Sequence, residues 1–212
     1  MWSNGEGARE IAGFCTVYRK VGSPLQPLVF LHGSNNNELS LADFAREVAS
    51  LRPQYIPRGR EPSGPSFTFF RRRKDGSIEE NLKARTEELS RLLFEVAQRH
   101  GQPALLIGFS SGAITAAALM ARHPAPAAGA ILLRPQIPFA ENCFPDLTGT
   151  PVLIVSARND ERRKRSDAAG LVNLLMAANA EAEWHELACG HGLDPEGGDI
   201  ELTRAWLAKR GS

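Results

Sequence analysis

The segment Gly108-Phe-Ser-Ser-Gly112 constrains the fold of this chain more than any other, because of the sequence on either side of it. The preceding residues 103–107 are a short apolar run that predicts a buried strand. The following residues 113–121 are small and apolar all round, which predicts a buried helix. Glycines at both ends of the segment let the backbone turn sharply without a side-chain collision. Ser110 is therefore predicted to project from the carboxyl edge of a sheet, in the geometry called a nucleophile elbow.

The sequence downstream supplies the side chains that such a serine needs. Residues 151–156 predict another buried strand, and Asp160 and Glu161 lie in the turn after it. Residues 181–187 alternate like a half-buried strand, and His191 lies in the loop beyond its end. Serine, acid and histidine in this order, with the last two after strands, are typical of α/β-hydrolases. We predict Asp160 as the acid, with Glu161 as the alternative, and His191 as the base.

The other four histidines fit structural roles better. His185 falls inside a predicted strand, and His100 and His123 fall at predicted helix ends. His32 follows an early buried strand, and we expect it to brace the loop that begins there by hydrogen bonding.

That early loop is also where a second oxyanion donor is expected. Attack by serine on a carbonyl places negative charge on its oxygen, which preorganised N–H groups must receive. One donor is the amide of Ser111, the residue after the nucleophile. The other is predicted to be the amide of Ser34, because Gly33 allows the backbone to turn this N–H inward.

Short buried strands alternate with helical patterns along the whole chain, which predicts a mostly parallel sheet with helices on both faces. No repeat or low-complexity linker divides the sequence, so we expect a single domain over residues 1–212. About seven strands in a chain of this length leave no room for a large lid domain. The expected strands cover residues 14–18 (at an edge), 28–31, 54–56, 103–107, 129–133, 151–156 and 181–187; the expected helices cover 38–51, 79–100, 113–121, 166–179 and a last stretch around 202–206; residues 58–77 and 134–150 are expected to be irregular.

Charge and cysteine content argue against several other functions. The chain has 25 Lys and Arg against 24 Asp and Glu, so nothing global indicates a nucleic acid or a membrane surface as partner. Two basic runs, residues 71–74 and 162–165, are expected to be solvated. Cys15, Cys143 and Cys189 form no metal-ligand pattern and suit free thiols in a reducing compartment. With no signal peptide and no membrane-spanning run, a soluble, cytoplasmic protein is expected.

Several segments together also resemble a known family. They are Phe30-Leu-His-Gly-Ser-Asn-Asn-Asn-Glu38, Pro57-Arg-Gly59, Phe69-Phe-Arg-Arg72, the Gly108–112 elbow and Gly190-His-Gly-Leu193. Their order is similar to that in the phospholipase/carboxylesterase family of small α/β-hydrolases. That family includes acyl-protein thioesterases, dienelactone hydrolase-like proteins and hydroquinone-linked bacterial carboxylesterases. The resemblance spans residues 27 to 208 and implies Ser110 as nucleophile, Asp160 as acid and His191 as base. The chain departs from the family at Glu161, where proline is usual, and at Cys189, where glycine is usual.

We therefore expect a serine carboxylesterase that hydrolyses small or medium esters through an acyl-enzyme, without a cofactor or metal. Its expected partner is a small-molecule ester, with no nucleic acid and no stable membrane insertion, and a homodimer is left open. A thioesterase or lysophospholipase is the alternative within the class. A non-catalytic binding protein is the alternative outside it.

The loop of residues 59–74 is the last candidate part of the site. Phe69, Phe70 and Arg71 lie close together in it, beside Phe67. Small-molecule pockets are mostly apolar, so we expect Phe69, Phe70 and Arg71 to line the substrate pocket above Ser110. The alternative is that the phenyl rings pack onto the sheet as part of the core.

Overall fold

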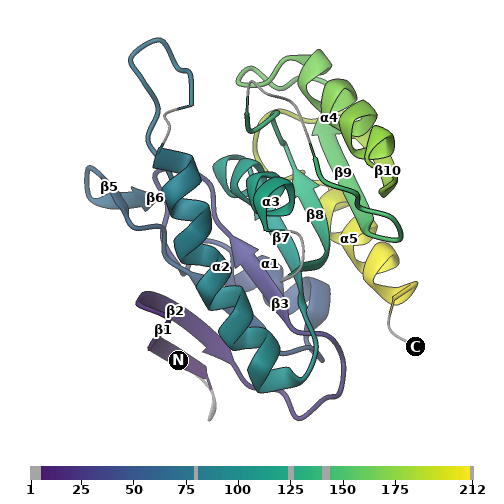
Figure 1. Cartoon of the computed structure of the whole chain (residues 1–212). Helices are drawn as coiled ribbons and strands as arrows, with labels where there is room; N and C mark the ends of the chain where they lie inside the picture. The colour runs from purple at the N-terminus through teal and green to yellow at the C-terminus, as the bar shows by residue number, and fades with distance from the viewer. Residues whose placement is uncertain (1–5, 79–80, 124–126, 140–143, 211–212) are drawn as a thin grey trace.

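The structure, a computed structural model, describes residues 6–78, 81–123, 127–139 and 144–210. Eight strands form one sheet in the order β1-β2-β4-β3-β7-β8-β9-β10, parallel from β4 to β10 and antiparallel at β1 and β2 (Figure 1). The predicted mostly parallel α/β-hydrolase sheet is confirmed, and no lid domain interrupts the described segments. The strands of this sheet are β1 Glu6–Ile11, β2 Phe14–Arg19, β3 Leu28–Leu31, β4 Gln54–Pro57, β7 Ala104–Phe109, β8 Ala127–Leu133, β9 Pro151–Ala157 and β10 Glu181–Leu187.

Helices cover both faces of the sheet, and each face has its own core. α2 (Asn81–His100), α3 (Ser111–Arg122) and α4 (Arg165–Ala177) pack on one face, and α1 (Ala42–Ala49) and α5 (Gly198–Ala208) on the other (Figure 1). Strand β3 contributes side chains to both cores, because successive side chains point to opposite faces. Val29 and Leu31 lie in the core on the α3 side, and Leu28 and Phe30 lie in the core on the α1 side. No helix in the described part of the chain combines the length and the apolarity needed to cross a membrane.

The amino-terminal hairpin corrects the predicted edge of the sheet. β1 lies outside β2, so residues 14–18 are not an edge strand, and the sheet has eight strands rather than about seven. β1 and β2 are joined by Ala12 and Gly13, both at positive φ, which is the geometry of a tight hairpin turn. β1 escapes prediction because an edge strand with one solvated face carries few apolar residues.

Two further segments differ from expectation. Within the predicted irregular stretch 58–77, β5 (Glu61–Ser63) and β6 (Ser66–Thr68) form a hairpin around Gly64, which has φ +60°. Phe67 of this hairpin exchanges two main-chain hydrogen bonds with Asn36, so the hairpin supports the loop after β3. α1 begins at Ala42 rather than near residue 38, because Asn37 accepts the N–H of Leu39 in a local turn that competes with the helix.

Candidate active site

Ser110 lies in a strained turn between β7 and α3. Its φ of 53° and ψ of −112° are rarely adopted by residues other than glycine, and its main-chain N–H donates to the carbonyl of Leu133 at 2.9 Å. A Cβ at Gly112 would lie 1.9 Å from the carbonyl oxygen of Leu31, and one at Gly108 would lie 2.5 Å from that of Gly112. Only glycine fits at both positions, so the two glycines allow α3 to approach the sheet and hold the serine at its carboxyl edge.

Three side chains from the ends of three strands form a hydrogen-bonded chain at this edge. His191 Nε2 lies 2.8 Å from Ser110 Oγ, and His191 Nδ1 lies 2.8 Å from both carboxylate oxygens of Asp160. With Nδ1–H donating to Asp160, the neutral ring leaves Nε2 to accept the proton of the serine hydroxyl. Burial lowers the pKa of His191 below 6.5; Asp160 raises it, whereas Arg163 and Arg162 lower it further.

The geometry separates Asp160 from its neighbour Glu161. The Asp160 side chain is 3% exposed, and its Oδ1 accepts the main-chain N–H groups of Arg162 at 2.8 Å and Arg163 at 3.0 Å. The Glu161 side chain is 65% exposed and forms an ion pair with Arg162 at 3.6 Å. Of these two carboxylates, Asp160 is therefore the one that forms a hydrogen bond with His191.

The two predicted oxyanion donors also lie at this edge. Ser111 is the first residue of α3, where the main-chain N–H groups have no partner within the helix. Ser34 lines the cavity that contains Ser110, and its Oγ lies 3.1 Å from Thr68 Oγ1 of the β5–β6 hairpin. Within the described part of the chain, neither amide N–H has an acceptor, so both are available to a substrate oxygen.

His32 braces the loop that carries Ser34. Its Nδ1–H donates to the carbonyl of Gly33 at 2.7 Å, and its Nε2 accepts the N–H of Gly59 at 2.9 Å. Burial lowers the pKa of His32 to about 4, so the ring is neutral near pH 7. The remaining histidines lie apart from Ser110: His100 ends α2 and bonds Tyr55, His123 caps α3, and His185 is exposed on β10.

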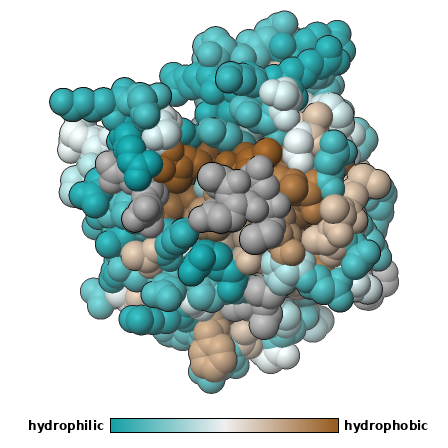
Figure 2. Space-filling model, turned by 45° about the horizontal axis from the view of Figure 1, so that its top comes forward, coloured by the Kyte–Doolittle hydropathy of each residue, from teal (hydrophilic) through white to brown (hydrophobic). Residues whose placement is uncertain are grey.

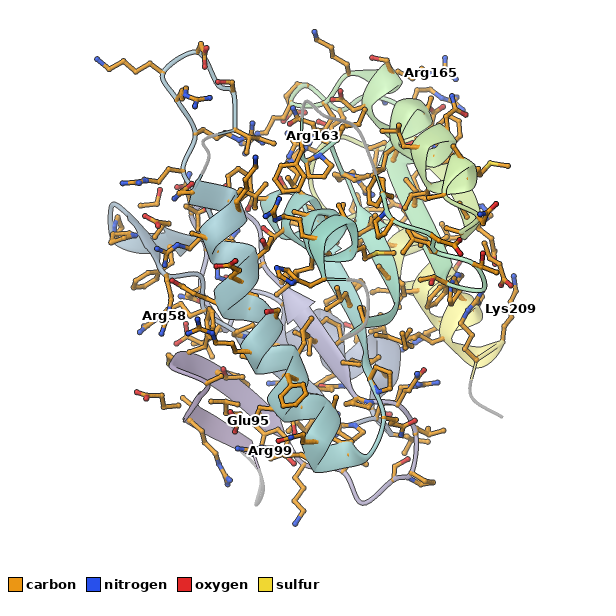
Figure 3. The ribbon with its side chains drawn as sticks, viewed as in Figure 1. Arg58, Glu95, Arg99, Arg163, Arg165 and Lys209 are labelled. Atoms are coloured by element: carbon orange, nitrogen blue, oxygen red, sulfur yellow. The ribbon has the colours of Figure 1, made fainter. Side chains whose placement is uncertain are left out.

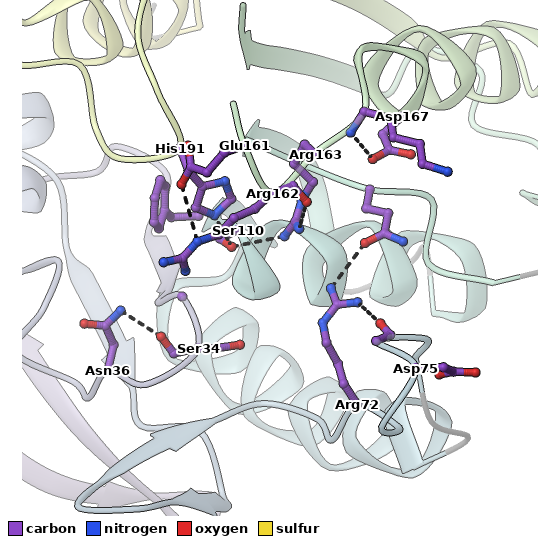
Figure 4. Close-up of a pocket in the computed structure, with 15 residues that line it drawn as sticks. Ser34, Asn36, Arg72, Asp75, Ser110, Glu161, Arg162, Arg163, Asp167 and His191 are labelled. Atoms are coloured by element: carbon purple, nitrogen blue, oxygen red, sulfur yellow. Dashed lines mark hydrogen bonds and ion pairs between the residues drawn. The ribbon is translucent and has the colours of Figure 1, made fainter. Parts of the chain in front are cut away.

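A cavity of about 730 Å³ opens above Ser110 and His191 (Figure 4). Most of the described residues that line it are polar or charged, and Phe109 is the only large apolar side chain among them. In a view with the top of the molecule turned forward, hydrophilic residues lie above a band of hydrophobic ones and to its left (Figure 2). The other described lining residues are Gly33, Ser34, Asn36, Arg72, Asp75, Gly76, Gln136, Glu161, Arg162, Arg163, Lys164 and Asp167.

The prediction that Phe69, Phe70 and Arg71 line this cavity is wrong. Phe69 is 1% exposed and Phe70 is 2% exposed, and both belong to the core on the α2 and α3 side of the sheet. The ring of Phe69 packs against that of His32, with centroids 4.7 Å apart. Phe69 therefore helps to hold the loop after β3, which contains His32, in place. Arg71 is exposed and pairs with Glu61 at 3.7 Å, and its neighbour Arg72 lines the cavity instead.

Proteins of known structure share this architecture over nearly the whole chain. The Bacillus cereus carboxylesterase is 31% identical and superposes with a TM-score of 0.86, over 92% of this chain and 94% of that one. This chain belongs to the carboxylesterase family. A carboxylesterase from Mesorhizobium loti is 29% identical, also with a TM-score of 0.86, over 96% of this chain and 99% of that one.

A curated relative agrees with this family assignment. The putative hydrolase MhqD of Bacillus subtilis (strain 168) is 29% identical over 195 residues, which are 90% of this chain and 96% of that protein. No protein-family model matches the chain. The carboxylesterase relatives confirm the family resemblance of the sequence and make this chain an enzyme of the hydrolase class.

The cationic wall of this carboxylesterase-family site is a feature that sequence reasoning missed. Residues 162–165 were expected to be solvated, yet Arg162, Arg163 and Lys164 line the cavity, and Arg163 Nη2 donates to Ser110 Oγ at 3.1 Å. The signal was available, because the run begins two residues after Asp160 and must therefore lie at the same edge of the sheet.

A buried ion pair behind His191 was also missed. Arg134, at the end of β8, donates to both carboxylate oxygens of Asp199 at 2.9 and 2.8 Å, and both side chains are fully buried. Arg134 also donates to the carbonyl of Gly192 at 3.0 Å and to Cys189 Sγ at 3.2 Å, so it ties down the loop that carries His191. Cys15 and Cys189 are free thiols, and Cys143 lies outside the described residues.

Proposed function

We propose that this chain is a serine carboxylesterase that hydrolyses small or medium esters through an acyl-enzyme. The observation that carries the proposal is the hydrogen-bonded chain from Ser110 through His191 to Asp160, which opens into the 730 Å³ cavity. Cavities of this size bind small molecules. The esterase-type activity of the relatives supports the same reaction class.

The geometry accounts for each step of the acylation. Ser110 Oγ attacks the ester carbonyl as His191 Nε2 takes its proton, and the carbonyl electron pair moves onto oxygen. The amides of Ser34 and Ser111 receive that negative charge. When the carbonyl re-forms, the C–O bond to the alcohol breaks, and His191 returns the proton to the departing oxygen.

Deacylation repeats these steps with water in place of serine. His191 takes a proton from the water as its oxygen attacks the acyl carbon, and the oxyanion forms in the same place. Collapse breaks the bond to Ser110 Oγ, which regains the proton from His191, and the carboxylic acid leaves. The Asp160 carboxylate orients and stabilises the imidazolium of His191.

The cavity favours an ester of limited length over the long acyl chains of the alternative thioesterase or lysophospholipase. A long acyl chain needs an extended apolar wall, whereas the described lining of this cavity is charged or polar apart from Phe109 and glycines. The hydrolase class of the relatives speaks against a non-catalytic binding protein.

Replacing the nucleophile tests the proposal directly. We expect Ser110→Ala to lower kcat for p-nitrophenyl acetate and butyrate by more than about 10³-fold. The circular dichroism spectrum should be unchanged, since among the described residues the hydroxyl forms hydrogen bonds only with His191 and Arg163. Ser90→Ala on α2, whose hydroxyl bonds only the carbonyl of Glu87, is the matched control. A fluorophosphonate should label Ser110 in the wild type, and turnover by Ser110→Ala would refute the mechanism.

A further inference from the structure

Arg163 is a half-buried cation beside the nucleophile, and its hydrogen-bond partners are all neutral. Each of its three guanidinium nitrogens donates one bond at 3.1 Å: Nη2 to Ser110 Oγ, Nε to the carbonyl of Arg134, and Nη1 to the carbonyl of Arg162. Among the described residues, no carboxylate forms an ion pair with it. Two main-chain carbonyls therefore fix the guanidinium in place, while each Nη keeps an N–H for another acceptor.

A cation in this position opposes ester hydrolysis unless something neutralises it. Its bond to Ser110 Oγ engages the lone pairs that must attack the substrate carbonyl. Its charge also disfavours protonation of His191, which must become an imidazolium during the reaction. Burial lowers the pKa of Arg163, because removing a charge from water is unfavourable, and the charge of Arg72 lowers it further, whereas Asp160 and Asp167 raise it.

The opposite wall of the cavity presents a second guanidinium of the same kind. Arg72, from the segment between β6 and α2, donates to the carbonyl of Gly76 at 2.7 Å and to Gln136 Oε1 at 3.2 Å (Figure 4). Both acceptors are neutral. Burial lowers the pKa of Arg72, and Asp167 acts in the other direction. Among the described ion pairs, none joins Asp167 to Arg72 or to Arg163.

The three carboxylates that line the cavity are already engaged elsewhere. Glu161 pairs with Arg162 at the exposed rim, and Asp167 accepts the main-chain N–H of Lys164 at the start of α4. Asp75 accepts two hydrogen bonds from Ser77. Among the described residues, Arg163 and Arg72 therefore form no ion pair, although Asp160 and Asp167 lie near enough to act on the charge of Arg163, whereas the three carboxylates of the cavity already have donors.

We infer that the substrates of this enzyme carry a carboxylate a few atoms from the scissile carbonyl, and that Arg163 binds this carboxylate, with Arg72 as a second contact. The planar guanidinium suits a carboxylate, and a hydrogen bond between two charged groups is stronger than one between neutral groups. The inference rests on the proposed esterase function and specifies its substrate class. The carboxylate can belong to the acid or to the alcohol part of the ester, and the test distinguishes the two.

Two matched pairs of esters test the inference. Monomethyl succinate and methyl succinamate carry the charged or the neutral group on the acid part, and acetoxyacetate and acetoxyacetamide carry it on the alcohol part. For at least one pair we expect kcat/KM of the wild type to be at least about tenfold higher for the carboxylate. The pair that shows the preference identifies the part of the ester that faces Arg163.

Variants within one basic run then assign the preference to a residue. Arg163→Gln should lower the ratio of carboxylate to amide kcat/KM at least about tenfold, mainly through KM. Arg72→Gln should lower it less. Arg165→Gln is the matched control, because Arg165 belongs to the same run but pairs with Glu186 at 3.1 Å, outside the cavity. Figure 3 shows Arg165 at the outer end of α4 and Arg163 over the end of the sheet.

A binding measurement separates this inference from the proposed function. Succinate, but not succinamide, should raise the thermal unfolding temperature of Ser110→Ala, and adding Arg163→Gln should remove that effect. If Arg163→Gln does not fold, Arg163→Lys keeps the charge without the planar fork and should give an intermediate ratio. Neutral p-nitrophenyl esters report on the proposed function alone. Equal kcat/KM within both pairs, or equal ratios for Arg163→Gln and Arg165→Gln, would overturn the inference.

Discussion

Asp160 is held in place by the main chain of the turn that follows it. Because its Oδ1 accepts two main-chain N–H groups, an asparagine here would keep its carbonyl oxygen in that place and turn its amide group toward His191. The histidine would then take the tautomer with the proton on Nε2, which cannot accept a proton from Ser110.

This geometry predicts opposite outcomes for two adjacent carboxylates. Asp160→Asn should lower kcat for a neutral p-nitrophenyl ester about 10⁴-fold, as loss of the equivalent charge does in serine proteases. Glu161→Gln should change it by less than about threefold, since its exposed ion pair with Arg162 contributes little. Steady-state kinetics of the two variants decide the matter. A large loss of kcat in Glu161→Gln, but not in Asp160→Asn, would show that Glu161 is the acid.

The rate of the reaction should depend on pH through His191. His191 must be neutral to accept the serine proton, and its pKa lies below 6.5 because burial, helped by Arg163 and Arg162, outweighs Asp160. For a neutral ester, kcat/KM should therefore be level around neutral pH and fall as the pH drops through that lowered pKa.

Removing the nearest cation should shift this acidic limb. Without Arg163 the imidazolium is less disfavoured, so Arg163→Gln should raise the pKa of His191 and move the limb to higher pH. Profiles from about pH 4.5 to 8 for the wild type, Arg163→Gln and Arg165→Gln make the comparison. The account of His191 would be contradicted if the acidic limb of the wild-type kcat/KM profile had an apparent pKa at or above 6.5. It would also be contradicted if this pKa were the same in all three proteins.

At the scale of elements, the Arg134–Asp199 pair joins the end of β8, the start of α5 and the loop that carries His191. Arg134→Met leaves the Asp199 carboxylate buried without a counter-ion, which costs about 3–5 kcal/mol. The thermal unfolding temperature should fall by about 10 °C. Calorimetry of the purified variant measures this change.

The double variant separates stability from positioning. Arg134→Met with Asp199→Leu removes both charges, so it should regain part of the lost unfolding temperature. It should not regain activity, because the hydrogen bond to the Gly192 carbonyl beside His191 is still missing. Full recovery of kcat would show that Arg134 has no part in placing the histidine.

The buried strands could be predicted from the sequence more accurately than the strands at the margins. Strands β3, β7 and β9 are buried on both faces and appear as continuous apolar runs, so their positions were predicted within two residues. β1 and the β5–β6 hairpin lie at solvated margins, where strands pair through the backbone and need few apolar side chains. Their sequences therefore hold no clear periodic signal.

For the molecule as a whole, the sequence could predict which segments meet but not which way their side chains turn. Ser110, Asp160 and His191 were placed together because the ends of parallel strands share one edge, and the structure brings them within hydrogen-bond distance. Their catalytic roles remain a prediction. The cavity wall was misassigned because the direction of a loop side chain depends on partners distant in sequence. Phe69 turns inward onto His32, and Arg163 turns inward toward the Arg134 carbonyl.

The turn between β9 and α4 has a consequence for the evolution of this enzyme. Asp160 is held by the N–H groups of residues 162 and 163, which any amino acid except proline supplies, whereas the side chains of these two residues form part of the cavity wall. Because neither side chain belongs to a core cluster, both positions can vary without disturbing the core, although a change at residue 163 also removes a hydrogen bond to Ser110 and a charge near His191. A directed-evolution library that randomises residues 162 and 163, with proline omitted, would explore new ester specificities on an unchanged scaffold.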